Sequence, residues 1–145
     1  MAQARDILKS KGTQVLSIGS DATVLDAAFL MNEHKIGALV VTRAGYVEGI
    51  VTERDVLRRV VAERRDPADV RVSQAMTREV LCCGPDTDLA EVAGVMMHHR
   101  VRHMPVVDER RRLMGILSLG DLNAHRVDTQ AATIQYLEAY LYGQS

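Results

Sequence analysis

The chain of 145 residues lacks several features on which whole classes of protein depend. It contains no Trp and only 3% aromatic residues, which argues against recognition of single-stranded nucleic acid by base stacking. Eighteen Lys and Arg residues against nineteen Asp and Glu leave a net charge of −1, so no basic surface for nucleic acid or an anionic membrane is expected. No apolar run approaches the ~20 residues that a membrane-spanning helix needs.

Targeting and redox features are equally scarce. Residues 1–11 are charged and contain no apolar stretch of the kind found in signal peptides. The only cysteines, Cys82 and Cys83, are adjacent, so they form neither a loop-closing disulfide nor a Cys-x-x-Cys pair. We therefore expect a cytoplasmic protein. Its 47% apolar and 26% charged residues are typical of an ordinary folded domain.

An internal repeat is the main feature that the sequence does contain. A shift of 65 superposes identical residues: Asp21 on Asp86, Ala28 on Ala93, Met31 on Met96, and His34 on His99. After one extra residue at a turn, the segment 49–55 (GIVTERD) falls on 115–121 (GILSLGD). We predict repeat 1 at 5–65, repeat 2 at 70–127, and a helical tail at 128–145.

Each repeat has the pattern of a β-α-β-β-α unit. Apolar residues at helical spacing predict one helix in each copy: Val24, Ala27, Ala28 and Met31, then Leu89, Val92, Ala93 and Met96. Extended apolar runs predict a hairpin in each copy, at 38–41 with 47–51 and at 104–107 with 113–117. Short strands at 14–18 and 80–83 precede the first helices. A second helix in repeat 1 has the apolar face Val56, Leu57, Val60 and Val61. The predicted class is therefore mixed α/β (α+β), with two repeats packed as a pseudo-two-fold pair.

The segments that close each repeat carry residue types suited to a nucleotide. An ionised Asp accepts hydrogen bonds from both hydroxyls of a ribose, and a Thr or Ser hydroxyl donates to a phosphate. Thr52 and Asp55, like Ser118 and Asp121, lie three residues apart at a predicted helix start, where unpaired N–H groups favour an anion. The same spacing equally predicts a capping box that serves only the helix. Spacing alone leaves both interpretations open.

The doubled pattern resembles cystathionine-β-synthase (CBS) domains arranged as one stand-alone CBS pair. The resemblance covers about residues 5–127 and is carried by Met76-Thr77, by 103–108 (HMPVVD), and by the repeated Gly-Ile-x-[Thr/Ser]-x-x-Asp ending. It implies a regulatory, non-catalytic protein that requires no cofactor. It also implies that an adenosyl ligand (AMP, ADP, ATP, NAD or S-adenosylmethionine) binds in clefts between the repeats.

The resemblance assigns ligand contacts to the closing segments and to the strand entrances. These residues are Thr52, Arg54, Asp55, Ser118, Gly120 and Asp121, with Ile18, Ile36, Gly37, Ala38, Val80, Arg102, His103, Met104 and Pro105. Arg102 and His103 would meet a phosphate at the rim, although solvated surface charges are the competing interpretation. Arg54 has Gly120 as its counterpart in the repeat, so we expect the two sites to differ in ligand preference.

Other chemistry has weaker support. Zinc needs three or four converging ligands, so His98, His99 and His103 are better explained as polar-face residues than as a metal site. Cys82 and Cys83 lie in a predicted strand, where alternation places one in the core and leaves redox sensing as the alternative. No Ser/His/Asp, Cys/His or paired-carboxylate arrangement indicates an enzyme.

The tail and the repeat helices bear on assembly. Ile134, Leu137 and Leu141 mark an apolar helix face that packs either on its own domain or on a second subunit. Phe29, Leu30 and Met97 lie off the core stripes of their helices, which predicts an apolar surface and a two-fold homodimer. We thus expect a sensor of adenine nucleotides that acts in trans on an effector protein. The alternative is a ligand-independent dimerisation module.

Overall fold

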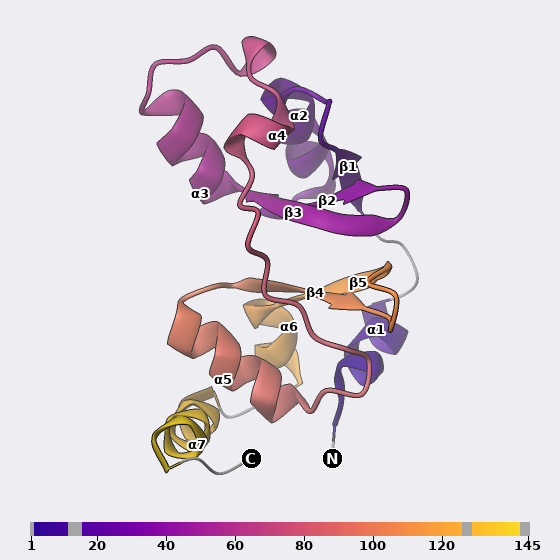
Figure 1. The fold of residues 1–145 in the computed structure, drawn as a ribbon, viewed down its shortest axis with the longest axis vertical. Coiled ribbons are helices and arrows are strands. Elements are labelled where there is room, and N and C mark those ends of the chain that lie inside the picture. The colour runs from indigo at the N-terminus through magenta and orange to yellow at the C-terminus, as the bar shows by residue number, and fades with distance from the viewer. Residues whose placement is uncertain (1, 12–15, 126–128, 143–145) are drawn as a thin grey trace. The chain divides into compact units, whose positions relative to one another are not determined.

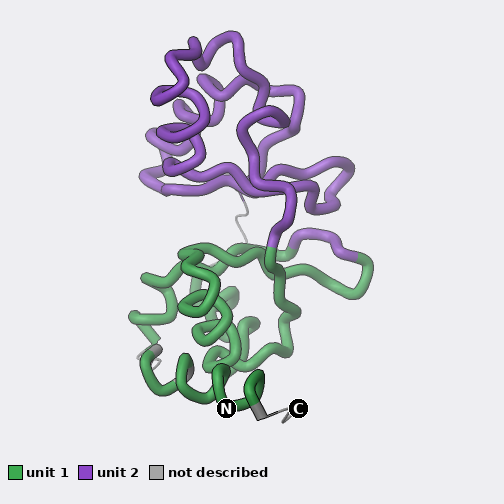
Figure 2. The backbone as a smooth tube through the Cα atoms, turned by 60° about the vertical axis from the view of Figure 1, so that its left-hand side comes forward, with its two compact units in different colours: residues 1–14, 81–110, 114–145 green, residues 15–80, 111–113 purple. Residues whose placement is uncertain are grey.

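The computed structural model of the chain describes residues 2–11, 16–125 and 129–142. The chain divides into two compact units, coloured separately in Figure 2. Unit 1 comprises residues 1–14, 81–110 and 114–145, and unit 2 comprises residues 15–80 and 111–113. Both units combine helices with a small sheet (Figure 1), which confirms the predicted mixed class.

Unit 2 contains a three-stranded sheet in the order β1-β2-β3. Its strands are β1 (Ser17–Gly19), β2 (Ala38–Arg43) and β3 (Tyr46–Thr52). β1 runs parallel to β2, and β2 pairs antiparallel with β3 across a turn at Ala44 and Gly45, both of which have positive φ. The predicted hairpin is thus confirmed. Residues 14 and 15 of the predicted first strand lie outside the described residues.

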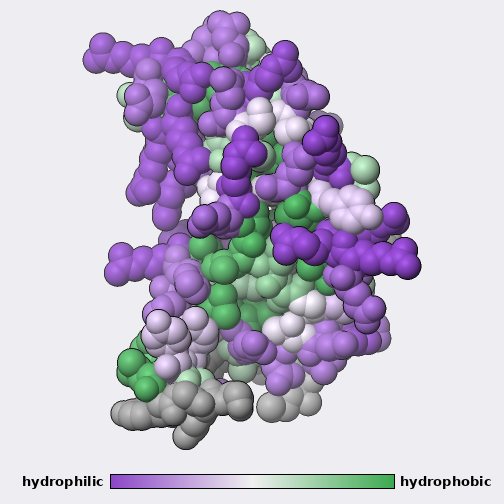
Figure 3. Space-filling model, viewed as in Figure 1, coloured by the Kyte–Doolittle hydropathy of each residue, from purple (hydrophilic) through white to green (hydrophobic). Residues whose placement is uncertain are grey.

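The helices of unit 2 lie on one face of that sheet (Figure 1). They are α2 (Val24–His34), α3 (Glu53–Val56), a π-helical turn (Leu57–Val61), a 3₁₀ turn (Pro67–Asp69) and α4 (Val72–Ala75). α2 begins at Thr23, whose hydroxyl accepts a hydrogen bond from the Asp26 N–H in a capping box, and it ends at Lys35 with φ 54°. Hydrophilic side chains cover most of the visible surface of this unit (Figure 3).

One predicted helix face in unit 2 is only partly correct. Val60 is buried, but Leu57 and Val61 are about 60% and 58% exposed. The chain here forms a π-helical turn, in which the Ala62 N–H donates to the Leu57 carbonyl. This turn holds more residues than an α-helical turn, so side chains spaced for an α-helix rotate away from the core.

Unit 1 contains the second hairpin and four helices within the described residues. The strands are β4 (His103–Val107) and β5 (Leu113–Ser118), and the helices are α1 (Ala4–Lys11), α5 (Leu89–His99), α6 (Leu119–Ala124) and α7 (Thr129–Tyr142). The predicted core face of α5 is confirmed, because all four of its apolar residues are buried: Leu89, Val92, Ala93 and Met96.

The prediction of a strand at 80–83 is wrong. Only Cys83 pairs with β4, through a parallel bridge to Val106 in which the Cys83 N–H donates to the Pro105 carbonyl. Extending this ladder to Leu81 would need an N–H on Pro105, which proline lacks. Val40 holds the corresponding position in repeat 1, and there β1 pairs normally with β2.

A short segment near the start of each repeat, residues 6–9 and 74–77, packs on the sheet of the other repeat; we call this segment the lead-in. In unit 2, the segment at the start of repeat 2 bridges to β3, where the Ile50 and Thr77 backbones exchange two hydrogen bonds. In unit 1, the N-terminal helix α1 packs against β5, where Leu8 lies directly over Gly115. Each compact unit is therefore completed by a segment from the other half of the sequence.

The C-terminal helix α7 packs against α5 within unit 1 (Figure 1). The rings of His98 and Tyr136 lie 4.9 Å apart, and Tyr140 lies 6.2 Å from His98. The tail thus docks on its own domain, as one of the two interpretations expected, but not through the predicted apolar face. Ile134 and Leu141 stay exposed on the outer side of α7.

Candidate functional site

The carboxylate of Asp55 lies at the start of α3, where it is only 9% exposed. Its Oδ2 accepts hydrogen bonds from the backbone N–H and the hydroxyl of Thr52, at 3.0 and 3.1 Å. Its Oδ1 accepts from the Thr77 hydroxyl at 3.2 Å, and the Arg59 Nε lies 4.0 Å away. Both oxygens of Asp55 are thus engaged by unit 2 itself.

Asp121 holds the equivalent position at the start of α6 but has different partners. Its Oδ2 accepts from the Ser118 N–H at 2.8 Å and from the Lys11 Nζ at 2.9 Å. No described residue donates to its Oδ1. Burial raises the pKa of Asp121, but the hydrogen bonds from Lys11 and Ser118 and the charge of Lys11 outweigh it, so the pKa lies below its ordinary value.

The capping interpretation of the closing segments is confirmed in both repeats. The Thr52 hydroxyl accepts from the Asp55 N–H at 3.1 Å, and the Ser118 hydroxyl accepts from the Asp121 N–H at 3.0 Å. Each aspartate closes its capping box with one oxygen only, Oδ2. Capping therefore leaves the second oxygen available in principle, and only in Asp121 does that oxygen lack a hydrogen-bond donor among the described residues.

A second repeated contact joins the strand entrances to the closing segments. The Glu53 N–H donates to the Gly37 carbonyl at 3.0 Å, and the Leu119 N–H donates to the Arg102 carbonyl at 2.9 Å. At Gly37 an added Cβ would lie 3.3 Å from the Glu53 carboxyl carbon, so a glycine lets that side chain approach. The structure thus brings Gly37 and Arg102 beside the two capping boxes.

Several other predicted contact residues have side chains in the protein interior. Met104 is 1% exposed and belongs to the core of unit 1, and Ala38 is buried at the start of β2. Ile18 packs against the core of unit 2, and Pro105 is buried in β4. Ile36 and Val80 are half-buried. Main-chain atoms remain the groups that Met104 and Ala38 can offer a ligand.

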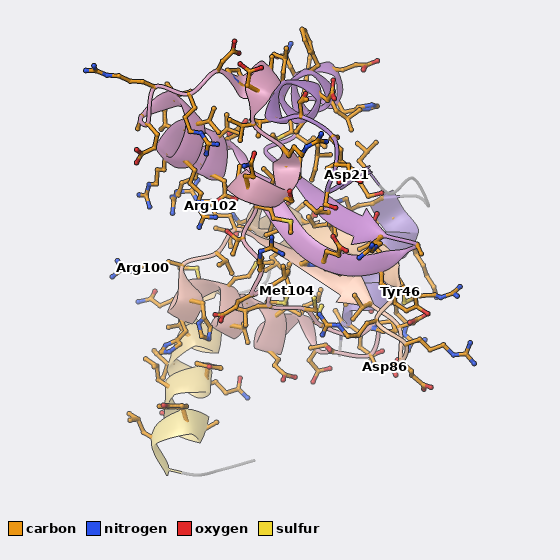
Figure 4. The ribbon with its side chains drawn as sticks, turned by 45° about the horizontal axis from the view of Figure 1, so that its top comes forward. Asp21, Tyr46, Asp86, Arg100, Arg102 and Met104 are labelled. Carbon is orange, nitrogen blue, oxygen red and sulfur yellow. The ribbon has the colours of Figure 1, made fainter. Side chains whose placement is uncertain are left out.

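The predicted basic and glycine positions are more accessible. Arg54 and Gly120 are exposed on the first turns of α3 and α6. Arg102 is exposed between α5 and β4, and His103 is half-buried at the start of β4. Arg100 ends α5 in the left-handed conformation, and its side chain extends away from the ribbon (Figure 4).

Three side chains at the two carboxylates are absent from the predicted contacts: Thr77, Arg59 and Lys11. Thr77 belongs to the repeated lead-in, so its motif was a usable signal. Arg59 is four residues beyond Asp55, in the π-helical turn that continues α3, and this spacing places the two side chains on one face. Lys11 lies 110 residues before Asp121, and no local pattern connects them.

A groove of about 500 Å³ opens in unit 2 between the C-terminal half of α2 and the α3–π segment. Its lining is mixed: Ile36 and Val56 supply apolar surface, and Lys35 and Glu53 supply opposite charges. Lys35 ends α2 with positive φ, as Arg100 ends α5. This groove adjoins the predicted contact residues Ile36 and Gly37.

Cysteine and histidine chemistry finds little support in the geometry. Burial, with smaller contributions from Cys82 and Glu91, raises the pKa of the Cys83 thiol to about 12. A thiol with such a pKa is not a nucleophile at neutral pH. Within the described ranges, no group of three or more His, Cys, Asp or Glu residues is placed to hold a metal ion. No helix in those ranges is long and apolar enough to cross a membrane.

Comparisons with known proteins agree with the repeat. The curated CBS domain-containing protein YhcV of Bacillus subtilis is 34% identical over 120 residues, which cover 83% of this chain and 84% of YhcV. The crystal structure of the CBS-domain containing protein ATU1752 from Agrobacterium tumefaciens has a TM-score of 0.79 and 38% identity, and the match covers 87% of this chain and all of that one.

A further solved structure holds ligands. The CBS domain pair of protein MJ0100, in complex with 5′-methylthioadenosine and S-adenosyl-L-methionine, matches with a TM-score of 0.76 and 26% identity over 86% of this chain and 94% of that chain. The sequence model of the CBS domain matches residues 4–62 and 72–128. Since these two matches span most of the sequence and coincide with its internal repeat, the chain belongs to the CBS domain family.

Proposed function

We propose that this CBS pair is a regulatory module that binds an adenosyl ligand and has no catalytic activity of its own. The observation that carries the proposal is the Asp121 carboxylate, whose Oδ1 is left without a donor by the described residues while Oδ2 is held in place. A fixed, ionised acceptor beside a Ser hydroxyl suits the vicinal hydroxyls of a ribose. The ligands in the MJ0100 structure, which share the adenosyl group, support this ligand class.

A thermal-shift screen with AMP, ADP, ATP, NAD and S-adenosylmethionine tests the proposal. A ligand at one hundred times its dissociation constant stabilises the folded protein by about 2.7 kcal/mol. We expect at least one of these ligands to raise the melting temperature. If none does so at millimolar concentration, the alternative of a ligand-independent assembly module takes the place of this proposal.

Calorimetric titration then tests the ribose contact. Asp121→Asn keeps the shape of the side chain but removes its charge, and we expect it to lose about 1.5–3 kcal/mol of affinity. AMP should also bind more tightly than 2′-deoxy-AMP, because one hydroxyl donor is missing from the latter. Asp69→Asn is the matched control, since Asp69 is exposed and lies outside both closing segments. Unchanged affinity in Asp121→Asn would leave Asp121 with capping alone.

Asp55 is a less direct test of the same idea. Because both of its oxygens already accept hydrogen bonds and it is buried, its replacement removes internal contacts as well as any ligand contact. We propose that the two sites are therefore unequal and that the site at Asp121 binds ligand more readily. The exposed Arg54 at one site and Gly120 at the other add to this difference.

Signalling requires that the ligand bind two arrangements of the protein unequally. We propose that a homodimer is the unit whose arrangement changes and that it acts in trans on an effector protein. Exposed apolar side chains on α2 and α5, among them Phe29 and Met97, support an interface between copies. Light scattering tests the dimer, and a change in the scattering of the dimer on addition of ligand tests whether its arrangement responds.

A further inference from the structure

Lys11, the last residue of α1, is in direct contact with the candidate site in unit 1. Its Nζ donates to Asp121 Oδ2 and to the Ile116 carbonyl, both at 2.9 Å. An ammonium group has three N–H donors, so one remains for another acceptor. The Lys11 side chain is 38% exposed, which leaves the ammonium accessible from solvent.

The equivalent site in unit 2 has a different charge arrangement. There the lead-in segment supplies the neutral Thr77 hydroxyl to Asp55. The nearby cation, Arg59, lies 4.0 Å from Asp55, and its Nη1 is already bonded to the carbonyls of Ala75 and Met76 at 3.1 and 2.7 Å. At the Asp121 site the cation donates a hydrogen bond to the carboxylate itself, whereas Arg59 lies 4.0 Å from Asp55 and donates to backbone carbonyls instead.

We propose that Lys11 sets the charge preference of the Asp121 site, favouring nucleotides with a 5′-phosphate over neutral nucleosides and over the cationic sulfonium of S-adenosylmethionine. The inference rests on the proposed function, because it assumes that a ribose donates to Asp121 Oδ1. A 5′ substituent would then lie within about one ribose length of Lys11. Opposite unit charges at about 7 Å, in a partly solvated site, attract by an amount that changes affinity roughly three- to tenfold.

The competing explanation is that Lys11 only ties α1 to β5 and α6. The two explanations differ in what they predict for ligand charge. A purely structural lysine changes stability and leaves the ratio of AMP to adenosine affinity constant. A lysine that attracts the phosphate changes that ratio, because AMP and adenosine differ only in the charged group.

The experiment compares Lys11→Met, which keeps the alkyl chain, with Lys11→Arg, which keeps the charge. Lys9→Met is the matched control, since Lys9 is an exposed lysine on the same helix. AMP, adenosine and S-adenosylmethionine are titrated at pH 7, and binding is followed by NMR at the amides of Gly120 and Asp121, so that only this site is read. Lys11→Gln provides a second neutral variant in case Lys11→Met does not fold.

We expect Lys11→Met to reduce the AMP-to-adenosine affinity ratio roughly three- to tenfold and to improve the relative affinity of S-adenosylmethionine. Lys11→Arg and Lys9→Met should keep the ratio of the unmodified protein. If AMP binds and the ratio is the same in all variants, the inference is overturned while the proposed function stands. If the unmodified protein binds none of the three ligands at this site, the inference is overturned, and the thermal-shift screen with all five ligands decides separately whether the proposed function stands.

Discussion

The two aspartates that close the repeats have the same sequence motif and the same cap, yet their surroundings differ. Asp55 accepts hydrogen bonds on both oxygens and is buried, whereas Asp121 uses one oxygen and is paired with Lys11. The capping and ligand-binding interpretations are therefore compatible at Asp121, because capping uses only Oδ2. At Asp55 a ligand has to share Oδ1 with the Thr77 hydroxyl. Equal motifs thus do not make equal sites.

The Lys11–Asp121 pair leads to a prediction about pH and stability. The pKa of Asp121 in the folded protein lies below its ordinary value of 3.8, so its charged form stabilises the fold above pH 3.8, and this contribution is lost as the pH falls through the lowered pKa. Lys11→Met should therefore cost about 0.5–1 kcal/mol at pH 7, because the pair is partly exposed, and progressively less below pH 3.8.

Urea unfolding at several pH values between 7 and 3 measures this cost. Lys9→Met, which removes an exposed lysine of the same helix, should show no such loss of effect at low pH. A destabilisation by Lys11→Met that stays constant down to pH 3 would mean that its alkyl chain, and not its charge, is what stabilises the protein.

Cys83 provides a second prediction at the residue scale. Because burial raises its pKa to about 12, the thiol stays protonated at pH 8 and should react slowly with Ellman's reagent in the folded protein. The Cys82→Ser variant isolates this thiol, and the unfolded protein in guanidinium chloride sets the full rate. Labelling of Cys83 at the unfolded rate under native conditions would contradict the prediction and reopen a redox role.

At the scale of elements, the lead-in from one repeat closely approaches a glycine in the sheet of the other repeat, once in each unit. An added Cβ on Gly49 would lie 2.8 Å from both the Met76 Sδ and the Thr77 carbonyl oxygen, which belongs to the backbone. On Gly115 it would meet the Cδ2 methyl of Leu8, the flexible end of a side chain. Gly49→Ala should therefore destabilise the protein by about 1–3 kcal/mol, and Gly115→Ala by less.

The two variants form a matched pair, since they make the same change at equivalent positions of the repeat. Their free energies of unfolding in urea give the comparison directly. Equal losses of unfolding free energy would mean that the lead-in of repeat 2 moves away from an added methyl group as easily as Leu8 does. The backbone contact at Thr77 would then not be rigid.

Periodicity and the repeat predicted most of the elements but not the packing of each lead-in on the sheet of the other repeat. The helix at 24–34 and both hairpins follow from spacing within a few residues, because each pattern is local. The lead-in segments pack on the opposite repeat, and hydrophobic patterns carry no information about which sheet a short helix covers. The strand at 80–83 fails because Pro105, on its partner strand, lacks a donor. The contact of Lys11 with Asp121 depends on this packing of the lead-in on the opposite repeat, so the sequence patterns could not predict it either.

At the scale of the whole molecule, the two repeats carry different residues at equivalent helix positions, and their surfaces differ as a result. The shift of 65 places Phe29 of α2 on Gly94 of α5. Gly94 is buried on α5, the helix that α7 packs against, whereas Phe29 is 65% exposed, and α2 has no corresponding helix among the described residues. A large apolar side chain in the place where the other repeat has a buried glycine indicates a surface that another molecule covers.

The last prediction concerns that surface. If α2 helices meet in a homodimer, light scattering at micromolar concentration should give twice the chain mass of 16.0 kDa, and Phe29→Asp should shift the mass toward the monomer. Ala68→Asp adds the same charge at an exposed position outside the main helices and should leave the dimer intact. A mass near 16.0 kDa for the unmodified protein would rule the dimer out. Removal of residues 128–145 separates the remaining possibilities: a dimer that persists is held by the repeat helices, and one that dissociates depends on the outer side of α7, where Ile134 and Leu141 are exposed.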